Sequence, residues 1–198
     1  MVYVNALGII ETTLVDTREL PDIGGRLHEE LATVDIPTLL RAELLHATTT
    51  GGETLGGAPD PDGAESEAEV AHVLLNLAGI PIEADIIRAM TRAECVDKPG
   101  KIRLSGDSEI QNLKIGGKSV VHVAPNQHTT LNVGLLKVEV VLDEQIKKAF
   151  TKNGFPGGEI KVNALRITVK GLLGVVKAKV IISSAKSDII CGLEPTDP

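Results

Sequence analysis

Closely spaced turn signals are the feature that most constrains the fold of this chain. Glycine adopts left-handed backbone angles at little steric cost, so Gly-Gly, Pro-Gly and Asn-Gly steps favour turns. These steps fall at Gly24-Gly25, Gly51-Gly52, Gly56-Gly57, Pro99-Gly100, Gly116-Gly117, Asn153-Gly154 and Pro156-Gly157-Gly158. The segments between them are mostly too short for long helices. We therefore predict an all-β protein.

Alternating apolar residues support this prediction. Val138, Val140 and Leu142 recur at every second position, and residues 165–169 read LRITV with the same period. Such a pattern is typical of half-buried strands. The chain contains two Phe, one Tyr and no Trp, so its core must be built from aliphatic side chains. A thin aliphatic core favours a β-sandwich or a jelly-roll-like domain.

Two stretches, 37–48 and 67–94, are rich in Leu, Ala, Glu and Arg, which are good helix formers. An internal repeat bears on them, in which an alanine is followed by an aliphatic residue three positions on and a small residue two positions further. Its copies are Ala42-Leu45-Ala47, Ala84-Ile87-Ala89 and Ala178-Ile181-Ser183. The third copy lies among β-branched residues, which favour strands. If the copies are equivalent, all three are strands; an all-helical protein is the alternative.

A second repeat relates the two ends of the chain. Residues 4–9 read VNALGI, residues 162–167 read VNALRI, and residues 110–115 read IQNLKI as a looser copy. The fold is therefore expected to contain internally repeated strands that lie side by side.

Residues 48–69 are rich in glycine and carboxylates and contain few large apolar side chains. Such a segment buries too little surface to offset the entropy of ordering it. We predict a flexible loop at 48–69 within a single β-rich domain of residues 1–198. Asp60 and Asp62 suggest a calcium loop as an alternative, but the regular spacing of that motif is not met.

The distribution of charge and apolar residues excludes several partners. Twenty-seven acidic and 20 basic residues give a formal charge of −7, and the basic residues are scattered, so no nucleic-acid partner is expected. The longest apolar runs are interrupted well before the roughly 20 residues that cross a bilayer. We therefore expect no membrane insertion.

Catalytic signatures are missing from the sequence. The histidines at 28, 46, 72, 122 and 128 form no HxxxH or HExxH motif, and neither a P-loop nor a GxGxxG or GxSxG motif occurs. Asp143 and Glu144 are adjacent, and adjacent strand residues point to opposite faces. We therefore predict that the protein is not an enzyme and that it has no cofactor, no metal and no catalytic residue.

Several segments in order carry a resemblance to a known family. Residues 106–117 read GDSEIQNLKIGG, 124–126 read APN, 140–145 read VVLDEQ, and 184–191 read SAKSDIIC. With residues 68–71, 86–89 and 162–165, these segments cover most of the chain, which resembles the choice-of-anchor P family of Gram-positive bacteria. The resemblance implies a β-rich extracellular or cell-surface domain without established enzymatic activity.

The two cysteines, Cys95 and Cys191, each follow a copy of the alanine repeat at a similar distance. If those strands are neighbours, the sulfur atoms lie close together and form an intramolecular disulfide. A bridge between chains and a pair of buried free thiols are the alternatives.

The ends of the chain bear on location and assembly. No leader pattern follows Met1 and no sorting motif follows Glu194, so release with a spore is expected in preference to cell-wall anchorage. We predict a structural protein of the cell or spore exterior that self-assembles into a layer or fibre by strand complementation. The candidate donor strand comprises Val2, Val4, Ala6, Leu7, Ile9, Ile10 and Leu14. The alternative is a monomeric binding module whose acidic loop and Ala124-Pro125-Asn126 turn contact a glycan or protein.

Overall fold

The computed structural model describes residues 2–6, 10–15, 17, 20, 24–36, 39–53, 59–97, 101–121 and 124–192. Strands dominate these residues, and the all-β prediction is confirmed. The strands are β1 (Val2–Ala6), β2 (Ile10–Val15), β3 (Gly25–Ile36), β4 (Leu40–Glu53), β5 (Pro59–Leu77), β6 (Ile80–Asp97), β7 (Lys101–Gln111), β8 (Lys114–Ile115), β9 (Lys118–Ser119), β10 (Gln127–Val133), β11 (Leu136–Lys152), β12 (Phe155–Lys170) and β13 (Val176–Ile190). One short 3₁₀ helix, η1 (Leu172–Gly174), lies between the last two strands.

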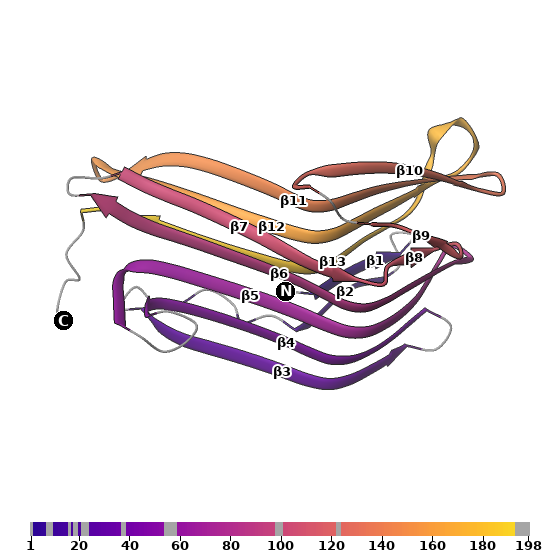
Figure 1. Ribbon diagram of the computed structural model, residues 1–198, viewed down its shortest axis with the longest axis horizontal. Coiled ribbons are helices and arrows are strands. Elements are labelled where there is room, and N and C mark those ends of the chain that lie inside the picture. Colours follow the sequence, from indigo (N-terminus) through magenta and orange to yellow (C-terminus); the bar gives the residue numbers. More distant parts are fainter. Residues whose placement is uncertain are drawn as a thin grey trace.

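The strands form two antiparallel sheets that pack face to face as a β-sandwich (Figure 1). The first, sheet A, has the order β10-β11-β12-β13-β1-β2. The second, sheet B, has the order β3-β4-β5-β6-β8-β9, and β7 also pairs with β6. Within each sheet most neighbours are consecutive in the chain, because short turns join antiparallel strands directly. There are two exceptions among the described strands. β6 pairs with β8 as well as with β7, and β1 pairs with β13, which brings the amino-terminal hairpin beside the last strand.

The core lies between the sheets and changes character along the strands. At one end large aliphatic side chains such as Ile82, Leu142 and Leu165 are fully buried. Towards the other end hydroxyl groups link the sheets. Ser66 Oγ donates to the main-chain oxygen of Lys186 at 2.6 Å, and Thr91 and Ser187 share a hydrogen bond of 2.8 Å. These bonds satisfy polar groups that burial would otherwise leave without water.

The long strands share a backbone irregularity at similar levels. Leu44, His72, Asp143 and Ser183 adopt positive φ angles of 50°, 49°, 50° and 59° inside β4, β5, β11 and β13. The register shifts there between β4 and β5, as at a β-bulge, but it continues unchanged from β11 to β12 and from β12 to β13. The residues that face the core change from even to odd numbers at this level, so in β5 the buried series runs through Val70 and then continues at Val73. The long strands curve together (Figure 1).

The prediction of a loop at 48–69 is wrong for the described part of that segment. Residues 48–53 belong to β4 and residues 59–69 to β5, and the two strands pair through most of this length; residues 54–58 lie outside the described residues. The small residues Ser66 and Ala68 face the other sheet, and the carboxylates that alternate with them, at 65, 67 and 69, pair with cations on the outer face. Cross-strand pairing and neutralised charge offset the ordering entropy that the composition implied.

The repeats are only partly equivalent in the structure. The first two alanine copies lie in strands, as predicted, but Ile181 of the third copy is half-exposed whereas Leu45 and Ile87 are fully buried. The strands that carry residues 4–6 and 162–167 are not side by side, because each pairs with β13 on opposite sides. A similar sequence therefore occupies both flanks of the last strand.

Among the described residues, no helix has the length and apolar character needed to cross a membrane.

Candidate functional site

Cys95 and Cys191 are brought together by the two sheets. Cys95 lies near the end of β6 in sheet B, and Cys191 follows β13 in sheet A. Their sulfur atoms lie 2.04 Å apart, at disulfide-bonding distance, and their Cα atoms lie 5.7 Å apart. The bond joins residues 96 positions apart in the same chain. It fastens the two layers of the sandwich at the end of the molecule where the described chain terminates (Figure 1).

The predicted donor strand is paired within its own chain. Val2, Val4 and Ala6 lie in β1, which pairs with β13, while Ile10 and Leu14 lie in β2, which pairs with β1. Leu7 and Ile9 lie outside the described residues. Donation of this segment to a second copy therefore requires the β1–β2 hairpin to leave its own sheet.

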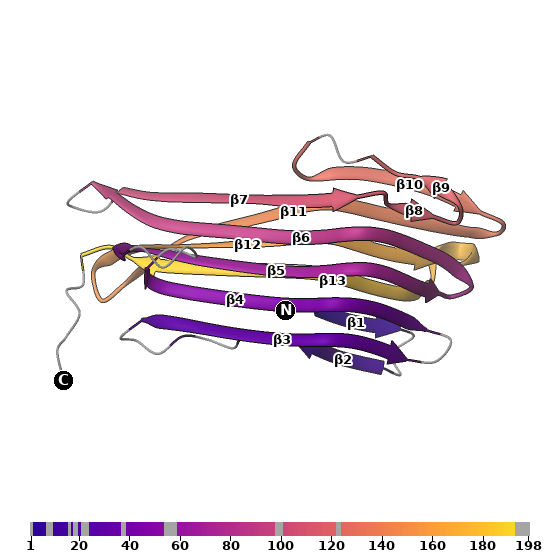
Figure 2. The ribbon, with the colours of Figure 1, turned by 60° about the horizontal axis from the view of Figure 1, so that its bottom comes forward.

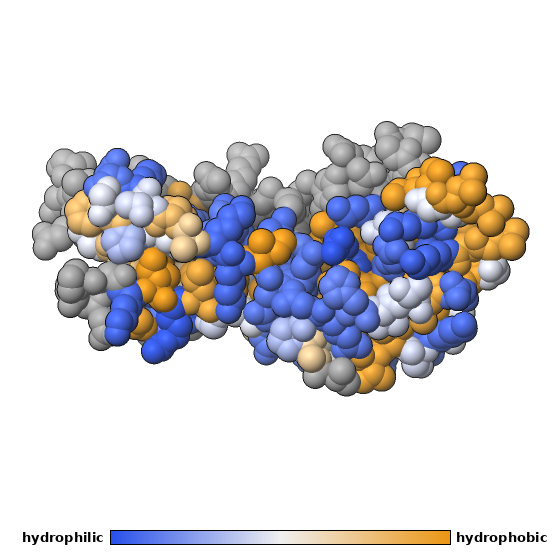
Figure 3. Space-filling model, turned by 90° about the horizontal axis from the view of Figure 1, so that it is seen from above, coloured by the Kyte–Doolittle hydropathy of each residue, from blue (hydrophilic) through white to orange (hydrophobic). Residues whose placement is uncertain are grey.

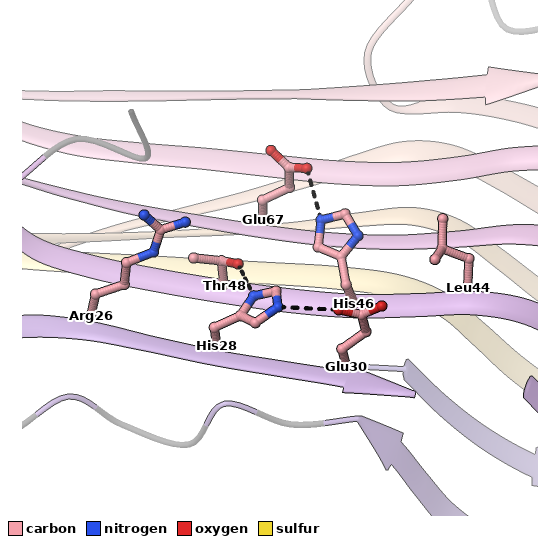
Figure 4. A pocket seen from close by; sticks show the side chains of 7 residues that line it. All are labelled: Arg26, His28, Glu30, Leu44, His46, Thr48 and Glu67. Atoms are coloured by element: carbon pink, nitrogen blue, oxygen red, sulfur yellow. Dashed lines mark hydrogen bonds and ion pairs between the residues drawn. The ribbon is translucent and has the colours of Figure 1, made fainter. Parts of the chain in front are cut away.

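A polar cavity of about 330 Å³ lies on the outer face of sheet B (Figure 4). Two histidines from neighbouring strands face it, and their ring centroids are 6.1 Å apart. His28 of β3 contacts the Thr48 hydroxyl through Nδ1 at 2.8 Å and Glu30 through Nε2 at 3.6 Å. His46 of β4 contacts Glu67 of β5 through Nε2 at 3.2 Å. Cross-strand neighbours on one sheet face meet in this way.

Further ion pairs continue from this cavity across the outer face. Arg88 of β6 contacts Glu67 at 3.6 Å, Glu109 of β7 at 3.3 Å, and Glu69. In a parallel row, Arg92 contacts Glu65 and Glu94. The carboxylates at 65, 67 and 69 thus balance cations on adjacent strands. Their spacing of two is the signal of one strand face, and the glycine- and carboxylate-rich composition on which the loop prediction depended concealed it.

The hydrogen bond with Glu67 raises the pKa of His46, and the same bond lowers the pKa of Glu67. Because its pKa is raised, His46 contributes its full stabilisation at pH values below the ordinary histidine pKa. This stabilisation is lost as pH rises through the raised pKa of the folded state. Because its pKa is lowered, Glu67 contributes its full stabilisation at pH values above the ordinary glutamate pKa. This stabilisation is lost as pH falls through the lowered pKa of the folded state. The pair therefore stabilises the fold most in mildly acidic solution.

We expect His46→Gln to reduce the stability gained between pH 8.5 and pH 5.5 by about 0.5 kcal/mol, because both partners are partly solvated. Thermal unfolding of both proteins at the two pH values measures this difference. Ser105→Gln, at an exposed position of β7, changes no titratable group; it is the control and should keep the pH dependence of wild type. An unchanged pH dependence in His46→Gln would show that the His46–Glu67 pair is not formed.

The cavity lacks the arrangement that nucleophilic catalysis requires. Thr48, His28 and Glu30 form a hydroxyl–imidazole–carboxylate series, yet Thr48 is buried within β4. Strands β3 and β5 flank β4, and the main-chain amides are used in the sheet, so they are not directed at an oxyanion beside Thr48. The series is therefore best explained as part of the polar face.

The carboxylates of Asp143 and Glu144 serve separate interactions. Asp143 is fully buried and accepts from Gln145 Nε2 at 3.0 Å, whereas Glu144 pairs with Arg166 at 2.7 Å. Asn126, from the predicted Ala124-Pro125-Asn126 turn, accepts a hydrogen bond from the main-chain N–H of Gln145 through Oδ1 at 2.8 Å. These contacts hold the β10 turn against β11 and leave the two carboxylates without a shared substrate position.

Within the described ranges, no group of three or more His, Cys, Asp or Glu side chains is arranged to hold a metal ion. The two described histidines outside the cavity lie apart: His72 forms the bulge of β5, and His128 lies in β10. His122 is outside the described residues.

The outermost strands of the two sheets differ in charge. Sheet A ends in β10, which contains no Lys, Arg, Asp or Glu, and in β2, which contains only Glu11. Sheet B ends in β3 and, on its other side, in β7 and the short β9. The charged residues of β3 and β7 are Arg26, Glu29, Glu30 and Asp35, and Lys101, Arg103, Asp107 and Glu109. Charged edges discourage strand addition, so sheet A has the more receptive edges.

Comparison of the chain with protein-family models, curated proteins and solved structures gave no match. The resemblance to the choice-of-anchor P family therefore stays a prediction.

Proposed function

We propose that the protein is a non-catalytic structural component of a cell or spore exterior that self-assembles into a layer or fibre. The observation that carries this proposal is the low charge of the two edges of sheet A. An uncharged edge strand presents main-chain donors and acceptors to a second strand. A second copy of this chain offers such a strand, because β2 and β10 both lie at an edge of sheet A and together contain one charged residue of the Lys, Arg, Asp and Glu types.

The direction of the edge strands supports repeated addition. All five pairings within sheet A are antiparallel, so β10 and β2, separated by four strands, run in opposite directions. A copy displaced across the strands without rotation therefore places its β10 antiparallel to the β2 of its neighbour. This contact joins two different surfaces and does not close, which is the geometry of a filament. Figure 2 shows β10 and β2 at opposite extremes of the molecule.

The cysteine pair supports an exterior location. Disulfides persist in oxidising compartments, and a β-rich chain with cysteines at disulfide-bonding distance is compatible with an extracellular location. The resemblance to a family of surface domains points the same way.

Negative-stain electron microscopy over a concentration series, with and without reductant, tests self-assembly. We expect filaments or sheets whose number rises with concentration and which survive reduction, because Cys95 and Cys191 pair within one chain. Uniform monomers at every concentration would refute self-assembly. Loss of the polymer on reduction, with the released chains still folded by circular dichroism, would instead place the disulfide between chains.

A variant of β10 tests the edge itself. Thr130→Lys places a charge on an exposed position of this strand and should abolish filaments without changing the melting temperature. Ser105→Lys, on the exposed side of the already charged β7, is the matched control and should polymerise as wild type does. Equal polymerisation of both variants would show that β10 is not the contact.

The cavity of Figure 4 favours a second candidate function, a monomeric binding module for a glycan or protein. Its lining of Arg26, His28, Glu30 and Thr48 offers hydrogen-bond donors and acceptors to a polar ligand. Binding of an oligosaccharide panel by a protein that stays monomeric, lost in His28→Ala, would support this function over assembly.

A further inference from the structure

Two neighbouring turns at one end of sheet A form a surface that we call the aliphatic tip, made of Leu135, Leu172, Leu173, Val175 and Val176. Leu173 is fully exposed, Leu135 is 78% exposed and Leu172 is 69% exposed. The β10–β11 turn and the segment between β12 and β13 are adjacent because β11 pairs with both β10 and β12. Figure 3 shows hydrophobic surface gathered at this end. A patch of this kind marks a contact surface.

The backbone at the tip makes Leu173 an unusual choice. Its φ and ψ are 64° and 16°, a left-handed conformation that glycine and asparagine adopt more easily than leucine. Leucine here is therefore unfavourable twice, through its backbone and through its exposed side chain. Among the described residues no contact covers this side chain, since it is fully exposed. A second molecule that buries it would offset both costs.

Lysines surround the tip. Lys177 and Lys179 are exposed on β13 beside it. Lys137 and Lys170 lie at the neighbouring strand ends and share one carboxylate, Glu139, at 3.1 and 2.6 Å. The tip is thus locally basic in a chain of formal charge −7. Its partner is expected to combine an apolar floor with an acidic rim.

The outer face of sheet B carries a surface of that description. A groove of about 560 Å³ lies over the bulge at His72 and is lined by residues of β4, β5 and β6, together with residues at the β7–β8 connection. Leu74, which is 52% exposed, supplies apolar surface. The lining holds three carboxylates, Glu43, Glu83 and Asp85, and two cations, Arg41 and Lys114. Arg41 pairs with Glu43 at 3.6 Å, so the excess negative charge lies with Glu83 and Asp85. We call this surface the outer groove.

We propose that the aliphatic tip of one copy docks in the outer groove of a second copy. Apolar side chains of the tip cover Leu74, and the lysines beside the tip face the carboxylates of the groove. Tip and groove are different surfaces of one chain, so this contact also does not close and extends the assembly in a second direction. The inference rests on the proposed self-assembly, to which it adds the interface that joins filaments into a layer.

Photo-crosslinking tests the contact directly. A photoreactive residue replaces Leu173 in unlabelled chains, which are mixed with ¹⁵N-labelled wild-type chains before irradiation. We expect mixed-isotope crosslinks between position 173 and peptides that contain residues 72–74 or 83–85. Intermolecular crosslinks to other regions, or to added anionic phospholipid vesicles in place of protein, would overturn the proposal.

Substitutions separate a contact from a structural role. Leu173→Gly should weaken self-association about tenfold in sedimentation, while its melting temperature stays equal or rises because the backbone strain is relieved. Ile146→Asn, which alters a 38%-exposed aliphatic residue of β11 outside the tip, is the control and should associate as wild type does. Equal association of Leu173→Gly and wild type would refute the tip.

Reversing the charges on the tip and on the groove provides a second test of the contact. Lys177→Glu with Lys179→Glu should weaken association, and mixing with Glu83→Lys, Asp85→Lys chains should restore it. Filaments that form normally while neither arm has an effect would refute the docking proposal and leave the proposed function standing. A wild-type protein that is monomeric at all concentrations would refute both.

Discussion

Removal of the Cys95–Cys191 bond should lower the free energy of unfolding by about 4 to 5 kcal/mol. A crosslink restricts the unfolded chain more as the loop that it closes lengthens, and this bond joins residues 96 positions apart. It also connects β6 of sheet B to the end of β13 in sheet A. Without the bond, these two segments can move far apart when the chain unfolds.

Urea unfolding of wild type and of the Cys95→Ser, Cys191→Ser double variant measures this effect. Reductant should lower the midpoint of wild type to that of the double variant and leave the variant unchanged, which provides an internal control. Intact mass under non-reducing conditions should be that of one chain. A double variant as stable as wild type would mean that the bond does not close this loop.

Gly106→Val should destabilise the fold by about 3 kcal/mol, because β7 packs closely on β12 at this position. A Cβ atom at residue 106 would overlap Val162 and lie 2.9 Å from Ile160 Cδ1. Both side chains are fully buried and cannot move outward. The main-chain oxygen of Gly106 also accepts a hydrogen bond from Gln145 Nε2 at 2.8 Å, which a shift of β7 would break.

Chemical denaturation of Gly106→Val beside Ser105→Val tests the packing of the two sheets at this point. Ser105 precedes Gly106 in β7 and is exposed, so the same β-branched side chain there should cost little. Equal midpoints for the two variants would contradict the close approach of β7 and β12.

The helix-rich composition of residues 67–94 illustrates why local sequence was ambiguous. The buried series of β5 passes from Val70 to Val73, and that of β6 passes from Ala84 to Ile87. A spacing of three is also the signature of a helical face. In the first two copies of the alanine repeat, the spacing of three joins two buried residues on either side of the point where the buried series changes from even to odd positions. In the third copy, the residue three positions after the alanine is only partly buried.

The acidic segment shows the opposite failure. Its composition alone indicated a loop, but Glu65, Glu67 and Glu69 alternate with the inward-facing Ser66 and Ala68. Their stabilising partners, which include Arg88, Arg92 and His46, belong to adjacent strands. No local rule reveals those partners, because strand pairing decides which side chains become neighbours.

Local sequence features were enough to establish the fold class. Turn signals and period-two aliphatic residues are local properties, and they were sufficient to predict an all-β sandwich. The strand pairing, the positions of the backbone irregularities, the approach of Cys95 to Cys191 and the combination of two distant turns into one aliphatic tip could not be predicted in this way. These features depend on contacts between residues far apart in the chain, and such contacts form only when the two sheets stack and bury their shared core.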